Sequence, residues 1–148
     1  MAGTFREVWN AILQSRIENP ATTLTGLLAI TTSAAGVYTP TLTNVANLDG
    51  STAFQCQYNQ VGTVVTVSGK VSVNPTAPAT LTQLGISLPV ASNIGAQEDC
   101  GGTAFASGIA GQGAAIRGDA ANNRAEMVWI AGDVSDQPMY FSFSYRVI

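Results

Sequence analysis

From residue 37 to its last residue, the chain carries short runs in which apolar and polar side chains alternate. Successive side chains of a β-strand point to opposite faces, so a period of two predicts strands with one buried face. The expected strands are 37–43, 52–59, 61–73, 85–89, 103–109, 114–118, 124–131 and 139–148. These runs, about eight in number and separated by Gly, Pro, Asn and Asp, predict an all-β, antiparallel sandwich or barrel over residues 37–148.

Residues 1–36 follow a different pattern, which predicts an N-terminal α-helical arm. Thr4 and Glu7 fit a capping box, and Asn19-Pro20 would end the helix. Apolar side chains recur at helical spacing at Phe5, Val8, Trp9, Ile12, Leu13 and Ile17. Residues 20–36 form either a second short helix or an extended arm.

The apolar face of that helix must be buried, either on its own domain or on a partner or sister subunit. The candidate docking residues are Phe5, Val8, Trp9, Ile12 and Leu13.

The low charge of the chain restricts its partners. Charged residues make up 10% of the sequence, against about 25% in a typical soluble domain. The net charge is −3 and the basic residues are scattered, so we expect no nucleic-acid partner. No apolar run reaches the roughly 18 residues of a membrane span, and the first residues lack a signal-peptide pattern. We therefore expect no membrane partner and assembly in a cytoplasm.

The residue types needed for most catalysis are missing, so the sequence predicts that the chain is not an enzyme. It contains no histidine, the usual general base and the commonest metal ligand. Cys56 and Cys100, the latter in an expected loop, are too few for a thiolate metal site and are predicted to be free thiols. No catalytic, metal or cofactor residue is assigned. The acidic residues considered for a glycosidase pair are Glu98, Asp99, Asp119, Glu126, Asp133 and Asp136.

Three further motifs have ordinary structural interpretations. The glycine-rich stretch 108–113 lies between expected strands and is not followed by a helix, so it predicts a turn and not a phosphate site. Arg117-Gly118-Asp119 spells an integrin-type tripeptide but is expected at a strand end. Among Trp129, Tyr140 and Tyr145, only Tyr140 shares its strand face with polar residues. Tyr140 is therefore the candidate surface aromatic for sugar stacking.

Several motifs, in this order, resemble a domain of tailed-bacteriophage structural proteins. They are 36–45 (GVYTPTLTNV), 58–71 (YNQVGTVVTVSGKV), 86–93 (ISLPVASN), 102–104 (GTA) and 141–145 (FSFSY). The resemblance covers roughly residues 36–148. It implies a jelly-roll-like domain, usually a homo-oligomer, of the kind found in head decoration proteins, head fibres and tail-fibre tips, with no catalytic residues. Gln60 stands where a basic residue is expected in this family.

Together these features predict a virion component that acts by binding. A short helical arm before a small β-domain favours a capsid decoration (cement) protein, which would form a homo-oligomer, a trimer, and bind the major capsid protein. The alternative is a tail-fibre or head-fibre domain that recognises a host cell-surface glycan, with Tyr140 in contact with the sugar.

Overall fold

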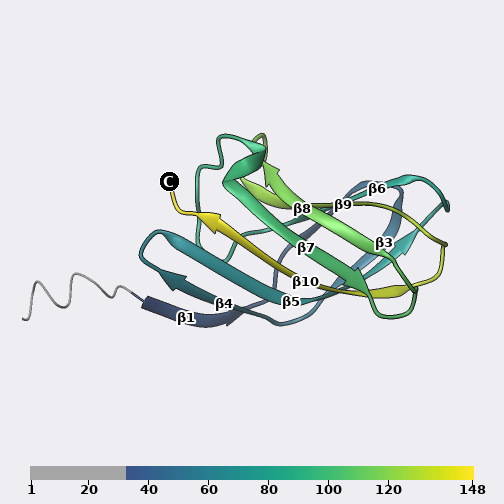
Figure 1. The fold of residues 1–148 in the computed structure, drawn as a ribbon, viewed down its shortest axis with the longest axis horizontal. Coiled ribbons are helices and arrows are strands. Elements are labelled where there is room, and N and C mark those ends of the chain that lie inside the picture. The colour runs from purple at the N-terminus through teal and green to yellow at the C-terminus, as the bar shows by residue number, and fades with distance from the viewer. Residues whose placement is uncertain (1–32) are drawn as a thin grey trace, which may run out of the picture. The chain divides into compact units, whose positions relative to one another are not determined.

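The computed structural model describes residues 33–148 (Figure 1). The predicted helical arm and all five candidate docking residues lie outside them. The elements in chain order are β1 (Ser33–Tyr38), β2 (Leu42–Ala46), β3 (Leu48–Ala53), β4 (Cys56–Val61), β5 (Val64–Pro75), β6 (Leu81–Ile86), the 3₁₀ turn η1 (Gln97–Asp99), β7 (Cys100–Ala106), β8 (Gly113–Asp119), β9 (Arg124–Ile130) and β10 (Gln137–Arg146).

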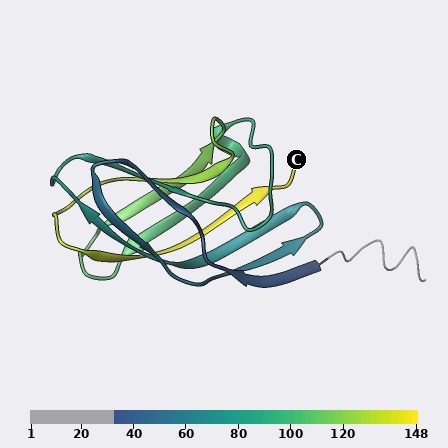
Figure 2. The ribbon, with the colours of Figure 1, turned by 180° about the vertical axis from the view of Figure 1, so that it is seen from behind.

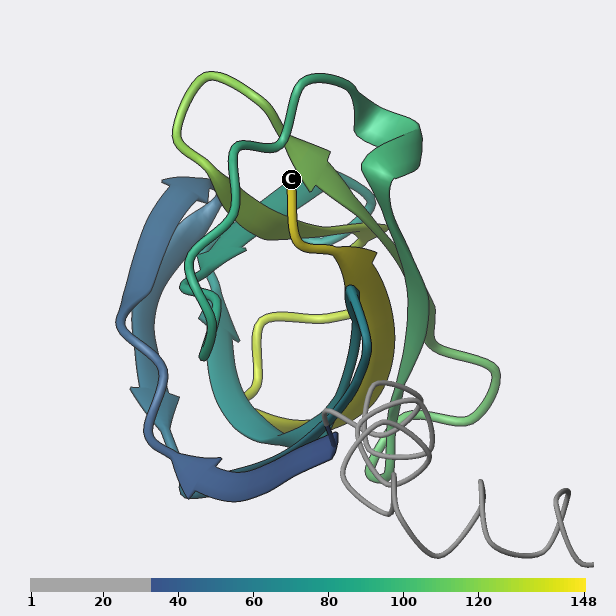
Figure 3. The ribbon, with the colours of Figure 1, turned by 90° about the vertical axis from the view of Figure 1, so that its left-hand side faces the viewer.

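The strands form one antiparallel sheet of ten, in the order β1-β4-β5-β10-β7-β8-β9-β6-β2, with β3 also paired to β5. Figures 1 and 2 show this sheet from its two sides, with β1 at one border beside β4. Figure 3 looks into the curled sheet from one end and shows the strands arranged around a common centre. The prediction of an all-β antiparallel fold is confirmed, and the sheet has the form of a half-barrel.

The core follows the alternation in the sequence. The inward side chains of three strands are buried: Val65, Val67, Val71 and Val73 of β5, Ala125, Met127 and Trp129 of β9, and Met139, Phe141, Phe143 and Tyr145 of β10. All of them belong to a single hydrophobic cluster. Because apolar burial is the main favourable term in folding, this cluster supplies most of the stability of the sheet.

The prediction of about eight strands was wrong, because two expected strands are each divided. The run 37–43 is divided around Pro40, where β1 ends and β2 begins. Proline has no N–H group to donate to a ladder, so the chain leaves one partner strand there and joins another. The run 52–59 is divided at Phe54 and Gln55 into β3 and β4.

The second division arises from β5, which is long enough to pair with two strands along one edge. Its first part pairs with β4 and its last part with β3, while the other edge pairs with β10. Gly69 lies where the two partners meet. A Cβ atom at this position would lie 2.2 Å from Sγ of Cys56 and 3.1 Å from the ring of Phe141, so only glycine fits.

The loop after β6 is attached to the end of β10 through Tyr145 and Ser92. The Tyr145 hydroxyl accepts a hydrogen bond from the Val90 N–H (3.0 Å) and donates one to the Val90 carbonyl (2.7 Å). Ser92 donates to the Arg146 carbonyl (2.7 Å) and accepts from the Ile148 N–H (3.1 Å). Two of the motifs that carry the phage resemblance, 86–93 and 141–145, are therefore in direct contact.

Candidate binding groove

Outward side chains of β4, β5, β10 and β7 form rows that cross the sheet. One row consists of Lys70, Tyr140 and Phe105, because Lys70 is opposite Tyr140 and Tyr140 is opposite Phe105. The next row consists of Gln57, Ser68, Ser142 and Thr103. Neighbouring strands lie about 4.8 Å apart, so side chains in one row are within contact range of each other.

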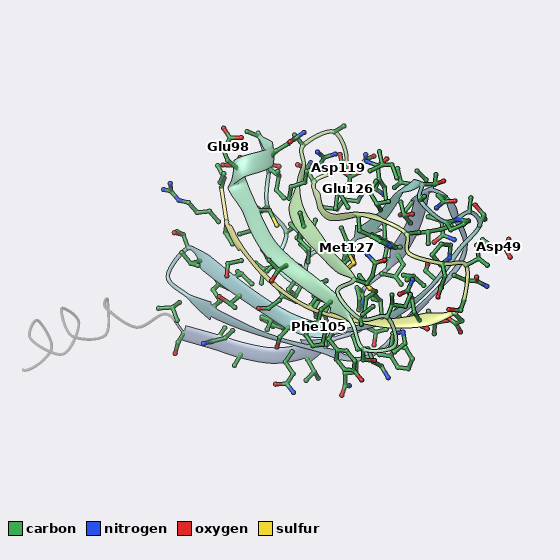
Figure 4. The ribbon with its side chains drawn as sticks, turned by 45° about the vertical axis from the view of Figure 1, so that its right-hand side comes forward. Asp49, Glu98, Phe105, Asp119, Glu126 and Met127 are labelled. Carbon is green, nitrogen blue, oxygen red and sulfur yellow. The ribbon has the colours of Figure 1, made fainter. Side chains whose placement is uncertain are left out.

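Phe105 and Tyr140 form an exposed aromatic pair. Their ring centroids are 5.6 Å apart and their planes differ by 21°, which is a stacked arrangement. Phe105 is 59% exposed and Tyr140 40% exposed, although most aromatic side chains of β10 are buried. Figure 4 shows Phe105 on the outside of the curled sheet and Met127 within it. Stacking covers one face of each ring, so the exposed pair offers a ligand an apolar platform made of the ring edges and the two outer ring faces.

A positive charge lies beside this platform. The Lys70 ammonium lies over the ring of Phe54, 3.8 Å from its centroid. A cation at this distance is attracted by the negative face of the ring, which holds the ammonium near one place without neutralising its charge. Lys70 therefore places a cation at one end of the row that ends in Phe105.

An open hollow of about 500 Å³ lies over these two rows and is the candidate site, which we call the aromatic groove. It is lined by Gln55, Gln57, Ser68, Gly69, Lys70, Thr103, Phe105, Tyr140, Phe141 and Ser142. Among the described residues that line it, Lys70 is the only charged one and none is acidic. The amides and hydroxyls around the aromatic pair can both donate and accept hydrogen bonds.

The acidic residues lie elsewhere and take part in local structure. Asp119 pairs with Arg124 (2.8 Å), and hydrogen bonds from Asn122 and Arg124 together with the Arg124 charge lower its pKa, although partial burial opposes the shift. Glu126 is buried and pairs with Arg117 (2.8 Å). The integrin-type tripeptide thus has both charged side chains bound within the fold, at the end of β8.

Among the remaining candidate carboxylates, Asp99 and Asp133 stabilise local turns. Asp99 accepts hydrogen bonds from the backbone N–H groups of residues 95 and 96, which closes η1. Asp133 accepts bonds from Ser135, and these lower the pKa of Asp133. Asp136 accepts a bond from Ser72 (2.7 Å). Glu98 lies on η1, away from Asp49 at the other end of the domain (Figure 4).

Both cysteines are free thiols, as predicted, and both are buried. The expectation of a loop around Cys100 was wrong: Cys100 begins β7 and is 3% exposed. Burial raises the pKa of Cys100 from 9.0 to about 12 and also raises that of Cys56. Within residues 33–148, no three Cys, Asp or Glu side chains gather closely enough to hold a metal ion. No helix in that part of the chain is both long and apolar enough to cross a membrane.

In the glycine-rich stretch 108–113, residues 108–112 belong to the connection between β7 and β8, and Gly113 begins β8. Gly111 has a φ of 75°, which glycine adopts without strain. Gln112 fastens this connection by accepting a bond from the Gly132 N–H (2.7 Å) and donating one to the Ile130 carbonyl (3.1 Å).

Tyr140 is the one sequence-predicted site residue within the described part of the chain, and it lies on the exposed face of β10. Sequence reasoning missed Phe105, Phe54 and Lys70. A phenylalanine in an alternating strand is normally assigned to the core. In β7 the neighbours Ala104 and Ala106 are buried, and because side chains alternate along a strand, Phe105 points outward. Only these two alanines could have indicated its orientation.

Neither the family models nor the curated proteins include a match to this chain.

Proposed function

We propose that this chain is a virion structural protein of a tailed bacteriophage, that it acts by binding and not by catalysis, and that it decorates the capsid. In this proposal the protein is assembled in the host cytoplasm, self-associates as a trimer and binds the major capsid protein. We further propose that the curled sheet is a variant of the jelly-roll sandwich, because opposite parts of the sheet face each other across one hydrophobic core.

The observation that carries the proposal is the outer face of β4, β5 and β10. Its outward positions are mainly hydroxyl and amide side chains, in the rows Gln57, Ser68, Ser142 and Asn59, Thr66, Ser144. Burying a charge against a neighbour is costly, whereas hydroxyls and amides need only matching hydrogen bonds. Such a face can therefore be covered by another protein at low desolvation cost.

The exposed aromatic pair supports the same conclusion. Tyrosine and other aromatics are enriched at the centres of protein interfaces, where they bury a large area with few rotatable bonds. The pair at Phe105 and Tyr140 lies beside the polar rows, so an apolar anchor and a polar surround occur on one face.

A reconstitution experiment tests this function. Purified protein is added to heads that lack it, and both occupancy and the thermal stability of the shell are measured. We expect saturable binding and a more stable shell, because a partner that binds only the assembled shell stabilises it by mass action. Native mass spectrometry of the purified protein measures the subunit number, for which we expect three.

Two matched variants locate the binding surface. Ser142→Arg places a long charged side chain on the exposed outer face of β10, whereas Leu81→Arg places the same side chain on the exposed part of β6. We expect Ser142→Arg to reduce occupancy and Leu81→Arg to leave it unchanged. Deletion of residues 1–19 should also reduce occupancy while the β-domain stays folded. Full occupancy with both the deletion and Ser142→Arg would contradict the proposal.

A receptor-binding role on a tail or head fibre is the second candidate, and one observation favours it. The aromatic groove combines a stacked ring pair with amides and hydroxyls, the groups that bind sugars in water. Binding of the purified protein to host cells, lost in Tyr140→Ala and kept in Leu81→Ala, would support this role. Equal binding by both variants would count against it.

A further inference from the structure

We propose that the aromatic groove binds an acidic saccharide, with sugar rings stacked on Phe105 and Tyr140 and a carboxylate of the sugar paired with Lys70. This inference rests on the proposed receptor-binding role, because a groove covered by a capsid protein would not be open to a saccharide. The observation behind it is the row in which a cation, a phenol and an open phenyl ring follow one another on three neighbouring strands.

The aromatic pair selects the class of ligand. The C–H faces of pyranose rings are flat and apolar, while their rims carry hydroxyls. The open ring face at Phe105 can cover the apolar side, and the surrounding Gln57, Ser68 and Ser142 side chains can bond the hydroxyls. The hollow is open and shallow, which suits a segment of a polymer lying along the surface more than an enclosed small molecule.

Charge selects the kind of saccharide. Lys70 is the only charged residue among those that line the groove, and no carboxylate there opposes an anion. Asp136 is bonded to Ser72 and lines a separate hollow. A sugar carboxylate at Lys70 would gain a charge-assisted hydrogen bond, whereas a neutral sugar would gain only an ordinary one.

The spacing of the row agrees with such a ligand. Two strand spacings separate Lys70 from Phe105, a distance of about 10 Å. This length accommodates about two linked sugar rings, with the acid group at one end and a stacked ring at the other. Nucleic acid also combines negative charge with flat rings, but its affinity depends on several cations contacting phosphates, and the groove supplies one.

The decisive experiment is a glycan array in which each uronic-acid oligosaccharide is printed beside its carboxyl-reduced, neutral counterpart. The full-length protein should bind one or more acidic members and bind their reduced counterparts about tenfold more weakly. Binding should weaken as salt is raised, because the Lys70 contact is partly exposed. No bound member, equal binding of the reduced counterparts, or binding only to oligothymidine printed on the same surface would overturn the inference.

Variants then locate the contact by calorimetry with the strongest member of the array. Tyr140→Ala and Phe105→Ala should each weaken binding about tenfold, since each removes half of the platform. Lys70→Gln should weaken binding of the acidic member to the level of its reduced counterpart, and Lys70→Arg should restore most of it. Leu81→Ala, an exposed apolar residue on β6, is the matched control and should bind normally.

The outcomes separate this inference from the proposed function. An array without binding, together with saturable binding to heads, would overturn the saccharide site and leave the structural role standing. If the protein bound neither the array nor the heads, the saccharide site and the structural role would both be overturned. Affinity unchanged by Tyr140→Ala and Lys70→Gln would place any saccharide outside the groove and would also overturn the inference.

Discussion

Gln137→Met should stabilise this protein, although most core substitutions destabilise. Gln137 begins β10 opposite Val73 and is 2% exposed. Neither its amide nitrogen nor its amide oxygen has a hydrogen-bond partner among residues 33–148. The amide therefore loses its bonds to water on folding and gains none in exchange.

The magnitude follows from the cost of burying such a group. A buried polar group without a hydrogen-bond partner lowers the stability of the folded state by about 1–3 kcal/mol. The methionine side chain has a volume similar to that of glutamine and carries no amide N–H or C=O group. We expect the free energy of unfolding to rise by about 1–3 kcal/mol. For a domain of this size, each 1 kcal/mol moves the midpoint of thermal unfolding by about 4 °C, so the midpoint should rise by about 4–12 °C.

Thermal and urea unfolding, followed by circular dichroism, measure the change. Gln137→Ala is the control, because it removes the same amide but leaves a cavity and should be less stable than Gln137→Met. A Gln137→Met variant less stable than the wild type would refute the reasoning. It would mean that the amide is hydrogen-bonded in solution, for example by an internal water molecule.

Three further predictions concern buried groups. Tyr145→Phe leaves the Val90 N–H and C=O without their partner, so urea unfolding should show a loss of about 1–3 kcal/mol; an unchanged midpoint would contradict it. Burial raises the pKa of Cys100 from 9.0 and of Tyr145 from 10.0, each to about 12, so their contribution to stability is complete below pH 9 and should be lost as the pH rises toward 12; a flat urea midpoint over that range would refute it. Cys56 and Cys100 should not react with a thiol reagent at pH 8 until the protein is unfolded, and fast labelling of the native protein would show that the thiols are accessible.

The close approach of β7 to β10 at Gly102 provides one more stability test. A Cβ atom at Gly102 would lie 2.3 Å from the Ser142 carbonyl oxygen and 2.5 Å from Cβ of Phe143. Gly102→Ala should therefore force β7 away from β10 and lower the thermal midpoint strongly. Gly101→Ala, where no atom lies within 4 Å of the added Cβ, is the matched control and should be tolerated.

The buried faces of the long strands β5 and β10 were predictable from the sequence, because the side-chain period of a strand is a local property. Residues 65–73 and 139–145 show which side chains face the core without any knowledge of their partners. The same alternation placed Tyr140 on the outer face, where the structure has it.

The pairing of the strands was decided by the tertiary structure, because register joins residues that are distant in the chain. Local alternation does not reveal that β5 pairs with both β3 and β4 along one edge. It also does not reveal that the expected strand 52–59 is divided between β3 and β4, or that the expected strand 37–43 is divided around Pro40. The aromatic groove depends on the same register. Phe105, Tyr140 and Lys70 come from three strands, and only the ladders β7–β10 and β10–β5 bring them into one row.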